Sequence, residues 1–249
     1  MNNTLNIAWL YPDLLNLHGD RGNLMAFERV GTEMDLDVKI NRVDSLSQDI
    51  DFDNSDIIFL NAGEIRMVGS IADSLRKFGN KIYEFAESGR PIIAIGTTGA
   101  VLGKKLERCS GEVIEGLGLL DIDAKERKEI FGDDLHFTLN DDKTEIIAVQ
   151  IHLVDFFNED KASALGTLVY GKGNNDSDKT EGAKKNNVIF TNALGPVFVK
   201  NPWFAEKIIN EALKATGREE KEKLSKDFFD IELKSADRIK AFIASKTEN

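Results

Sequence analysis

The sequence predicts an α/β fold: a doubly wound, mostly parallel sheet flanked by helices, with antiparallel additions and a helical C-terminal extension. Three observations predict this fold class. Short apolar runs alternate with helical segments over residues 5–95. From Glu112 onward, the pattern changes to short strands separated by turns. Residues 219–246 then carry apolar side chains at helical spacing, which is typical of an amphipathic helix.

The N-terminal half contains the alternating strands and helices. Its expected strands are residues 5–10, 38–43, 56–60 and 92–95. Apolar residues at helical spacing predict one helix after Asn23 and a second helix over residues 71–86. Right-handed crossovers place the carboxyl ends of parallel strands at one edge of the sheet. We therefore expect any site to lie in the loops after Leu10, Leu60 and Ile95.

The C-terminal half contains shorter strands and the extension. Its expected strands are residues 135–139, 145–152, 165–170 and 188–191. Residues 171–187 are nearly all Gly, Asn, Asp, Lys and Ser, which predicts a loop too polar to bury. Pro202 opens a helix that runs to about Thr216. We divide the chain into a domain over residues 1–216 and a helical extension over residues 217–249, packed on the domain or on a partner.

Composition disfavours several classes of function. The net charge of −11 repels phosphate backbones, so we expect no nucleic-acid binding. We expect no membrane span, because no apolar run is long enough, and no secretory signal, because the N-terminus lacks a positive region. The lone Cys109 forms no internal disulfide and no cysteine-built zinc site, and it fits a reducing compartment. We expect a cytoplasmic protein without a metal or other cofactor.

The segment PIIAIGTTGAVLG, residues 91–103, has the pattern of a strand, a tight turn and a helix. Such an elbow is how α/β enzymes present a catalytic residue above a sheet. We interpret the hydroxyls of Thr97 and Thr98 as helix caps, because an unassisted threonine is a weak nucleophile. A turn of this kind also binds anions through backbone N–H groups. A non-catalytic module for a small anion or amino acid therefore stays open.

Three stretches of the chain resemble one family of enzymes. They are LYPDLLNLHGDRGNL, GEVIEGLGLLD, and GKGNNDSDKTEG followed by NVIFTNALGPVFVKNPWFAEKII. Together they resemble the glutamine amidotransferases of the cobyric acid synthase type and, within that family, the amidotransferase subunits of lipid II isoglutaminyl synthases. The resemblance implies a flavodoxin-like class I amidotransferase fold. It also implies a Mur-ligase-like partner, which uses ammonia from glutamine to amidate a precursor of cell-wall peptidoglycan, lipid II.

The same resemblance places replacements at both catalytic positions. With Leu102-Gly103 in register, Gly96 stands where the family has its cysteine nucleophile. Leu194 stands where the family's Thr-x-x-His-Gly-Pro segment has histidine. The strand end that helps to hold the substrate carries Gly63 and Glu64, which we also count as degenerate pocket positions, together with Thr97 and Thr98 of the elbow. Neither glycine nor leucine can attack an amide carbon or move a proton.

Three further features carry candidate roles. Gln150 and His152 resemble a Glu-Ile-His segment of some relatives and are counted as degenerate pocket positions, with His152 interpreted as a satisfied, partly buried histidine. His136 alternates with apolar neighbours on a strand, so we expect it to face solvent. The strongest intact motif is Asp20, Arg21, Gly22 and Asn23. We expect it either to hold a loop or to shape the pocket or the ligase contact.

These observations leave three hypotheses. The leading one is a pseudoenzyme: a catalytically degenerate amidotransferase-like subunit that keeps the fold and the partner surface, with no catalytic residue. The second is an active glutamine-hydrolysing subunit with a relocated nucleophile, for which Cys109 is the one thiol, although we interpret it as a bystander. The third is a binding module that holds a small carboxylate or a glutamine-like ligand in the pocket without hydrolysing it.

Overall fold

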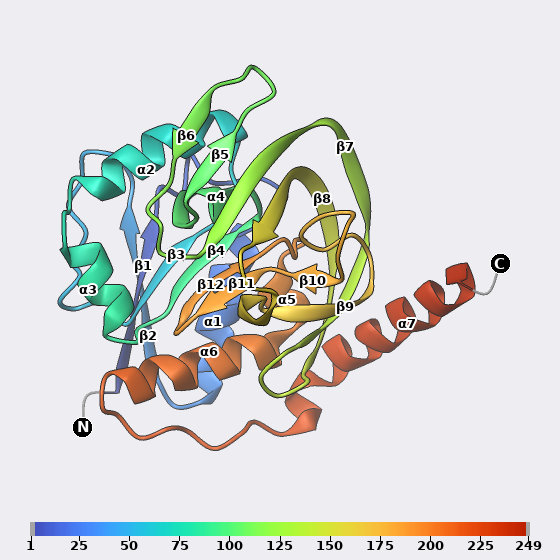
Figure 1. The fold of residues 1–249 in the computed structure, drawn as a ribbon. Helices are drawn as coiled ribbons and strands as arrows, with labels where there is room; N and C mark the ends of the chain where they lie inside the picture. Colours follow the sequence, from blue (N-terminus) through green and yellow to red (C-terminus); the bar gives the residue numbers. More distant parts are fainter. Residues whose placement is uncertain (1–2, 248–249) are drawn as a thin grey trace.

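Two β-sheets with flanking helices make up the fold (Figure 1), in a computed structural model that describes residues 3–247. Within these residues, six strands form the first sheet in the order β11-β12-β4-β3-β1-β2. They are β1 (Thr4–Leu10), β2 (Asp37–Val43), β3 (Ile57–Leu60), β4 (Ile92–Ile95), β11 (Ala183–Lys185) and β12 (Val188–Thr191). All pairs are parallel except β11 with β12. The parallel strands follow the flavodoxin-like order 2-1-3-4-5, which confirms the doubly wound sheet.

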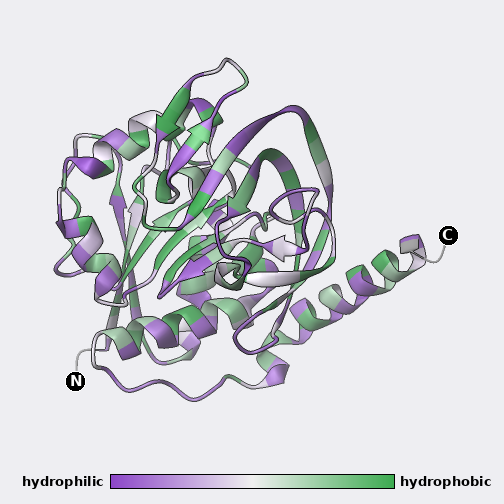
Figure 2. Cartoon of the chain, in the orientation of Figure 1, coloured by the Kyte–Doolittle hydropathy of each residue, from purple (hydrophilic) through white to green (hydrophobic). Residues whose placement is uncertain are grey.

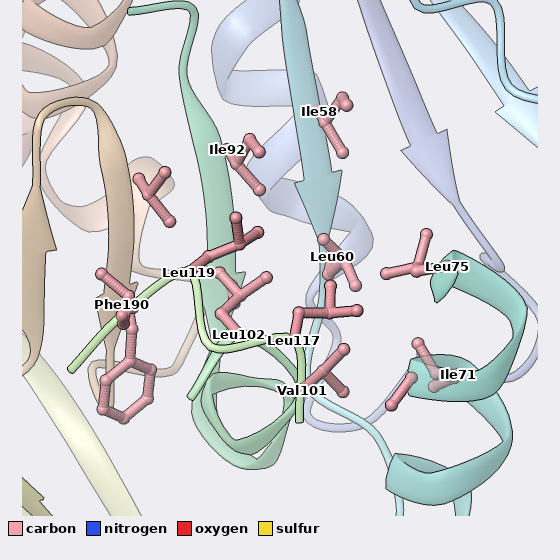
Figure 3. Close-up of a cluster of buried hydrophobic side chains, with 14 of the residues drawn as sticks. Ile58, Leu60, Ile71, Leu75, Ile92, Val101, Leu102, Leu117, Leu119 and Phe190 are labelled. Carbon is pink, nitrogen blue, oxygen red and sulfur yellow. The ribbon is translucent and has the colours of Figure 1, made fainter. Parts of the chain in front are cut away.

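Alternate residues of the central strands face opposite layers of helices. Along β4, Ile92 and Ala94 face one core, whereas Ile93 and Ile95 face the other. The helices over the first core are α2 (Val68–Arg76), α3 (Lys81–Glu87) and α4 (Gly99–Leu102). The helices over the second core are α1 (Arg21–Glu33), α5 (Val197–Lys200) and α6 (Pro202–Ala215). Figure 2 shows polar residues on the outer faces of α2, α3 and α6, and Figure 3 shows the apolar side chains that meet in the first core.

The second sheet supplies the antiparallel additions that the sequence predicts. Its strands are β5 (Lys105–Glu107), β6 (Val113–Glu115), β7 (Ile122–Leu139), β8 (Glu145–Asn158), β9 (Gly166–Tyr170) and β10 (Thr180–Glu181). Only β5 and β7 pair in parallel among the pairings of this sheet within the described residues. Strands β7 and β8 form a long hairpin that is longer than predicted, with a register shift between Glu126 and Phe131. The irregular stretch brings residues of β7 to the edge of the first sheet.

The prediction of one helix over residues 71–86 is wrong. Helix α2 ends at Arg76 and α3 begins at Lys81. Between them, Gly79 adopts a φ of +56°, a left-handed conformation that ends a helix and that glycine adopts without a steric penalty. The helical spacing of apolar residues continues across this break because both helices bury their apolar sides in the same core.

The prediction that residues 171–187 are too polar to bury is also wrong. This segment contains β10 and β11, and several of its polar side chains are buried. Asn174 accepts a hydrogen bond from the Gly182 N–H at 2.7 Å. The carboxyl group of Glu181 accepts from the Thr191 hydroxyl at 2.6 Å, and complete burial raises the pKa of Glu181 above its usual value. These polar side chains can be buried because they form hydrogen bonds within the segment and with neighbouring residues.

The C-terminal segment packs against the same body. It contains a 3₁₀ turn, η4 (Lys226–Phe229), and helix α7 (Asp230–Thr247), which lies at the edge of the molecule beyond β9 in Figure 1. Phe229 and Ile243 are buried, and Lys240 pairs with Glu145 of β8 at 3.1 Å. Three more 3₁₀ turns are η1 (Ile65–Met67), η2 (Gly96–Thr98) and η3 (Lys161–Ser163). Among the helices of residues 3–247, none is long and apolar enough to cross a membrane.

Replacing Arg218 tests the contacts that hold the segment after α6 against β1 and Asp56. The Arg218 guanidinium donates to the Thr4 carbonyl at 2.6 Å and pairs with Asp56, whose side chain is 11% exposed. We expect Arg218→Ala to lower the free energy of unfolding by about 2–3 kcal/mol, because it removes the ion-pair partner of the buried Asp56. Urea unfolding measures the loss. The control Arg238→Ala, on an exposed position of α7, is expected to change stability by less than about 0.5 kcal/mol; equal effects of the two changes would contradict the prediction.

Candidate functional site

The elbow at the end of β4 keeps the backbone geometry that presents a catalytic residue. Strand β4 ends at Ile95, and Gly96 follows with a φ of +61°, which L side chains rarely adopt. A Cβ atom on residue 96 would lie 3.3 Å from the Ala62 Cβ and 3.6 Å from the Leu194 Cδ2. The elbow therefore presents a hydrogen atom, and the space above it is bounded by two apolar side chains.

A pocket of about 300 Å³ lies over this elbow. Its walls come from the loops after β1, β3 and β12, from the elbow, and from β7 and β8. The expected loops after Leu10, Leu60 and Ile95 thus meet at one edge of the sheet. Among the predicted site residues, the pocket is lined by Gly63, Glu64, Gly96, Thr97 and Leu194. The remaining described residues that line it are Leu17, His18, Ala62, Ile65, Ile130, Ile151 and Leu153.

Both threonines of the elbow are held by internal hydrogen bonds. The Thr98 hydroxyl accepts from the Ile95 N–H at 3.1 Å and donates to the Ile95 carbonyl at 2.9 Å. Thr98 is buried and does not appear among the described residues that line the pocket. The Thr97 hydroxyl donates to the Gly63 carbonyl and joins the elbow to the loop after β3. These contacts agree with the interpretation of Thr98 as a cap, whereas Thr97 bonds a neighbouring loop instead of the helix.

Gln150 and His152 do not line the pocket, because side chains alternate along β8. Ile151 and Leu153 face the pocket, whereas Gln150 and His152 face the loop that contains Gly173. The Gln150 amide donates to His152 Nδ1 at 2.7 Å, and His152 Nε2 donates to Asp155 Oδ1 at 2.6 Å. Burial lowers the pKa of His152, so the ring is neutral at pH 7.5. His152 is fully buried rather than partly buried, and both of its ring nitrogens have partners.

The Asp20-Arg21-Gly22-Asn23 motif connects three segments behind the pocket. Asp20 accepts from the Ala62 N–H at 3.3 Å, and Asn23 accepts from the Phe198 N–H at 3.0 Å. Arg21 pairs with Asp13 at the surface, and the helix expected after Asn23 begins earlier, at Arg21. None of the four residues is among the described pocket-lining residues. The contacts favour a structural role, since they hold the loops that form the pocket walls.

His136 and Cys109 lie outside the pocket, and His18, which lines the pocket, is uncharged at pH 7.5. His136 was expected to face solvent, but it is buried and bonds Glu145 at 3.0 Å, because α7 covers this part of the hairpin. Cys109 is exposed between β5 and β6, with its N–H donating to Glu126, and it is not among the described pocket-lining residues. Partial burial lowers the pKa of His18, so its ring is neutral at pH 7.5. Within residues 3–247, no group of three or more His, Cys, Asp or Glu side chains forms a metal site.

Sequence reasoning missed the apolar wall of the pocket. Ile130 and Ile151 come from β7 and β8, far along the chain from the elbow. Because side chains alternate along a strand, the sequence could have placed Ile151 on the opposite face of β8 from His152. No sequence pattern identifies Ile130, because it lies within the irregular stretch of β7, where the pairing with β8 shifts register.

Comparisons with known proteins identify relatives over most of the chain. A model of the CobB/CobQ-like glutamine amidotransferase domain matches residues 6–202. The chain is 31% identical over 225 residues to the lipid II isoglutaminyl synthase (glutamine-hydrolyzing) subunit GatD of Streptococcus pneumoniae, covering 84% of this chain and 81% of that protein. It is 28% identical over 213 residues to the subunit GatD of Staphylococcus aureus, covering 86% of each.

Two solved structures share the fold at low sequence identity. PurLQS from Thermotoga maritima matches with a TM-score of 0.59 and 16% identity, over 85% of this chain and 99% of that chain. The crystal structure of a glutamine amidotransferase matches with a TM-score of 0.54 and 16% identity, over 83% of this chain and 98% of that chain. These similarities confirm the class I amidotransferase fold that the sequence resemblance implies.

Replacing Thr98 with its isostere tests the capping of the elbow. Thr98→Val keeps the side-chain shape but leaves the buried Ile95 N–H without its hydroxyl partner. We expect the free energy of unfolding to fall by about 1–3 kcal/mol, measured by urea unfolding. The control Thr32→Val, at an exposed position of α1, is expected to change stability by less than about 0.5 kcal/mol. A Thr98→Val protein as stable as the control would contradict the capping role.

The pH dependence of stability tests the buried state of Asp20. Burial raises its pKa from 3.8 to about 7, whereas the Ala62 N–H lowers it. A carboxylic acid whose pKa is higher in the folded than in the unfolded state contributes its full stability at pH values below the unfolded-state pKa. This contribution is lost as the pH rises to the folded-state pKa. Between pH 4 and pH 8, we therefore expect Asp20→Asn to gain stability relative to wild type by on the order of 4 kcal/mol, at about 1.4 kcal/mol per pKa unit.

Urea unfolding at several pH values measures this difference. Asp35→Asn, on an exposed turn after α1, serves as the control and is expected to follow the wild type throughout the range. A difference between Asp20→Asn and wild type that stays constant from pH 4 to pH 8 would contradict the raised pKa of Asp20.

Proposed function

Because the chain belongs to the CobB/CobQ-like glutamine amidotransferase family, we propose that it is a catalytically degenerate subunit that does not hydrolyse glutamine. The observation that carries this proposal is the elbow. Gly96 occupies the position where a side chain would be presented, and Leu194 approaches that position from the loop after β12. Hydrolysis of an amide needs a nucleophile and a group that moves its proton, and neither side chain supplies them.

The relocated-nucleophile alternative has less support. Cys109 lies in the hairpin formed by β5 and β6, and it is not among the described residues that line the pocket. A thiol attacks an amide only within contact distance of the carbonyl carbon. His18 is the histidine among the described pocket residues, and the hydroxyl of Thr97, which also lines the pocket, already donates to the Gly63 carbonyl. The proposal therefore assigns no catalytic residue.

The proposed partner is a Mur-ligase-like protein that amidates the cell-wall precursor lipid II in the cytoplasm. Two observations support it: the GatD relatives are named as subunits of a lipid II isoglutaminyl synthase, and the three motif stretches resemble that subunit. The lone cysteine fits a cytoplasmic location. In this proposal the chain stabilises or regulates the ligase instead of supplying ammonia.

We further propose that residues 217–249 form an extension of the amidotransferase-like domain over residues 1–216. The family match ends at residue 202, and α6 ends at Ala215. The described part of the extension packs on the domain, where Arg29 pairs with Glu232 at 2.6 Å. Ile231 and Phe242 of α7 remain exposed, so this extension also offers apolar side chains to a partner.

Ammonia release from glutamine tests the proposed function. We expect the purified chain to release ammonia no faster than a buffer blank, alone and mixed with a Mur-ligase-like protein, because the elbow carries no nucleophile. A coupled glutamate dehydrogenase assay measures the rate. Release above the blank would overturn the proposal, and its loss in Cys109→Ala, with Thr32→Val as a control, would favour the relocated nucleophile.

A further inference from the structure

The pocket over the elbow has walls that suit hydrocarbon rather than an amide. Of the twelve described residues that line it, seven carry aliphatic side chains and two are glycines. The three with polar side chains are His18, Glu64 and Thr97. A pocket of about 300 Å³ is at the small end of sites that hold small molecules.

The polar groups of this wall offer little to a polar ligand. The Thr97 hydroxyl already donates to the Gly63 carbonyl, and the Gly63 N–H donates to Thr97 Oγ1 at 3.3 Å. Glu64 pairs with Arg66 at 2.6 Å, and its carboxylate repels the carboxylate of an amino acid. His18 has a lowered pKa and adds no positive charge at pH 7.5. Moving the charged and amide groups of glutamine into this pocket would remove water without replacing its hydrogen bonds.

Two isoleucines flank the mouth of the pocket. Ile130 is 68% exposed and Ile151 is 43% exposed, although both line the pocket. Leu194 and Ala62 form the wall next to the elbow, with Leu194 Cδ2 3.6 Å and Ala62 Cβ 3.3 Å from the position of a Cβ on residue 96. An aliphatic ligand would cover these side chains and remove them from water, and the hydrophobic effect favours that burial.

We propose that this pocket binds a small, neutral, branched aliphatic molecule in place of glutamine. The inference rests on the proposed function, because a pocket that still hydrolysed glutamine would have to hold its amide. The aliphatic group lies against Leu194 and between Ile130 and Ile151. The ligand is neutral because Glu64, the charged side chain among the described residues of the wall, repels an anion and is already paired with the cation of Arg66.

Methyl NMR of protein labelled at the isoleucine δ1 carbons tests this inference. The probes are 4-methyl-1-pentanol, with a branched aliphatic end, 1,5-pentanediol, in which a hydroxyl replaces that end, and L-glutamine. We expect 4-methyl-1-pentanol to shift the Ile130 and Ile151 signals saturably. We expect its affinity to be at least about tenfold higher than that of the diol or of L-glutamine, because the diol and glutamine place a polar group against the apolar wall.

Matched variants locate the binding. Ile151→Ser is expected to weaken binding of 4-methyl-1-pentanol at least about fivefold, followed by the Ile130 signal, and its exposed position preserves the fold. Val169→Ser, at a 59% exposed position of β9 outside this pocket, is expected to leave the affinity unchanged. Shifts that do not saturate, equal affinities in both variants, or tighter binding of L-glutamine would each overturn the inference. Such outcomes leave the proposed function intact, whereas ammonia release overturns that function itself.

Discussion

The left-handed backbone at Gly96 is the constraint on which the candidate site depends. A strand that enters a helix through this turn directs residue 96 toward the carboxyl edge of the sheet, where the loops after β1, β3 and β12 meet. In this chain that position holds only a hydrogen atom, and Ala62 and Leu194 close around it. The same geometry that exposes a nucleophile in an active enzyme here creates an apolar pocket. The elbow geometry is thus present with glycine, which has no side chain, at residue 96.

The hydrogen bonds around the elbow explain how the geometry persists. Thr98 caps the turn through Ile95, and Thr97 joins it to the loop after β3. Asp20 holds the same loop through the Ala62 N–H from behind the pocket. None of these contacts involves a group that attacks or protonates a substrate. The fold around the elbow therefore does not depend on a catalytic side chain at residue 96.

Much of the fold could be predicted from the sequence, because β3 and β4 are short apolar runs with clear boundaries and β2 alternates polar and apolar residues. The break between α2 and α3 could not be predicted. Both helices bury apolar residues in the same core, so the apolar spacing continues across the turn at Gly79. The burial of Glu181 was not predicted, because composition shows how polar a segment is but not whether a polar group forms hydrogen bonds. In the site, the motif register identified Gly96 and Leu194, but Ile130 reaches the pocket through a register shift that no local pattern reveals.

The central claim is that no nucleophile in this chain reaches glutamine, and covalent labelling measures this most directly. The glutamine analogue 6-diazo-5-oxo-L-norleucine carries a reactive diazoketone that alkylates a nucleophile positioned at a glutamine site. Intact-protein and peptide mass spectrometry after incubation would detect an adduct and locate it. The account predicts no adduct that excess glutamine suppresses. An adduct on Cys109 or on a residue of the elbow pocket, suppressed by glutamine, would contradict it.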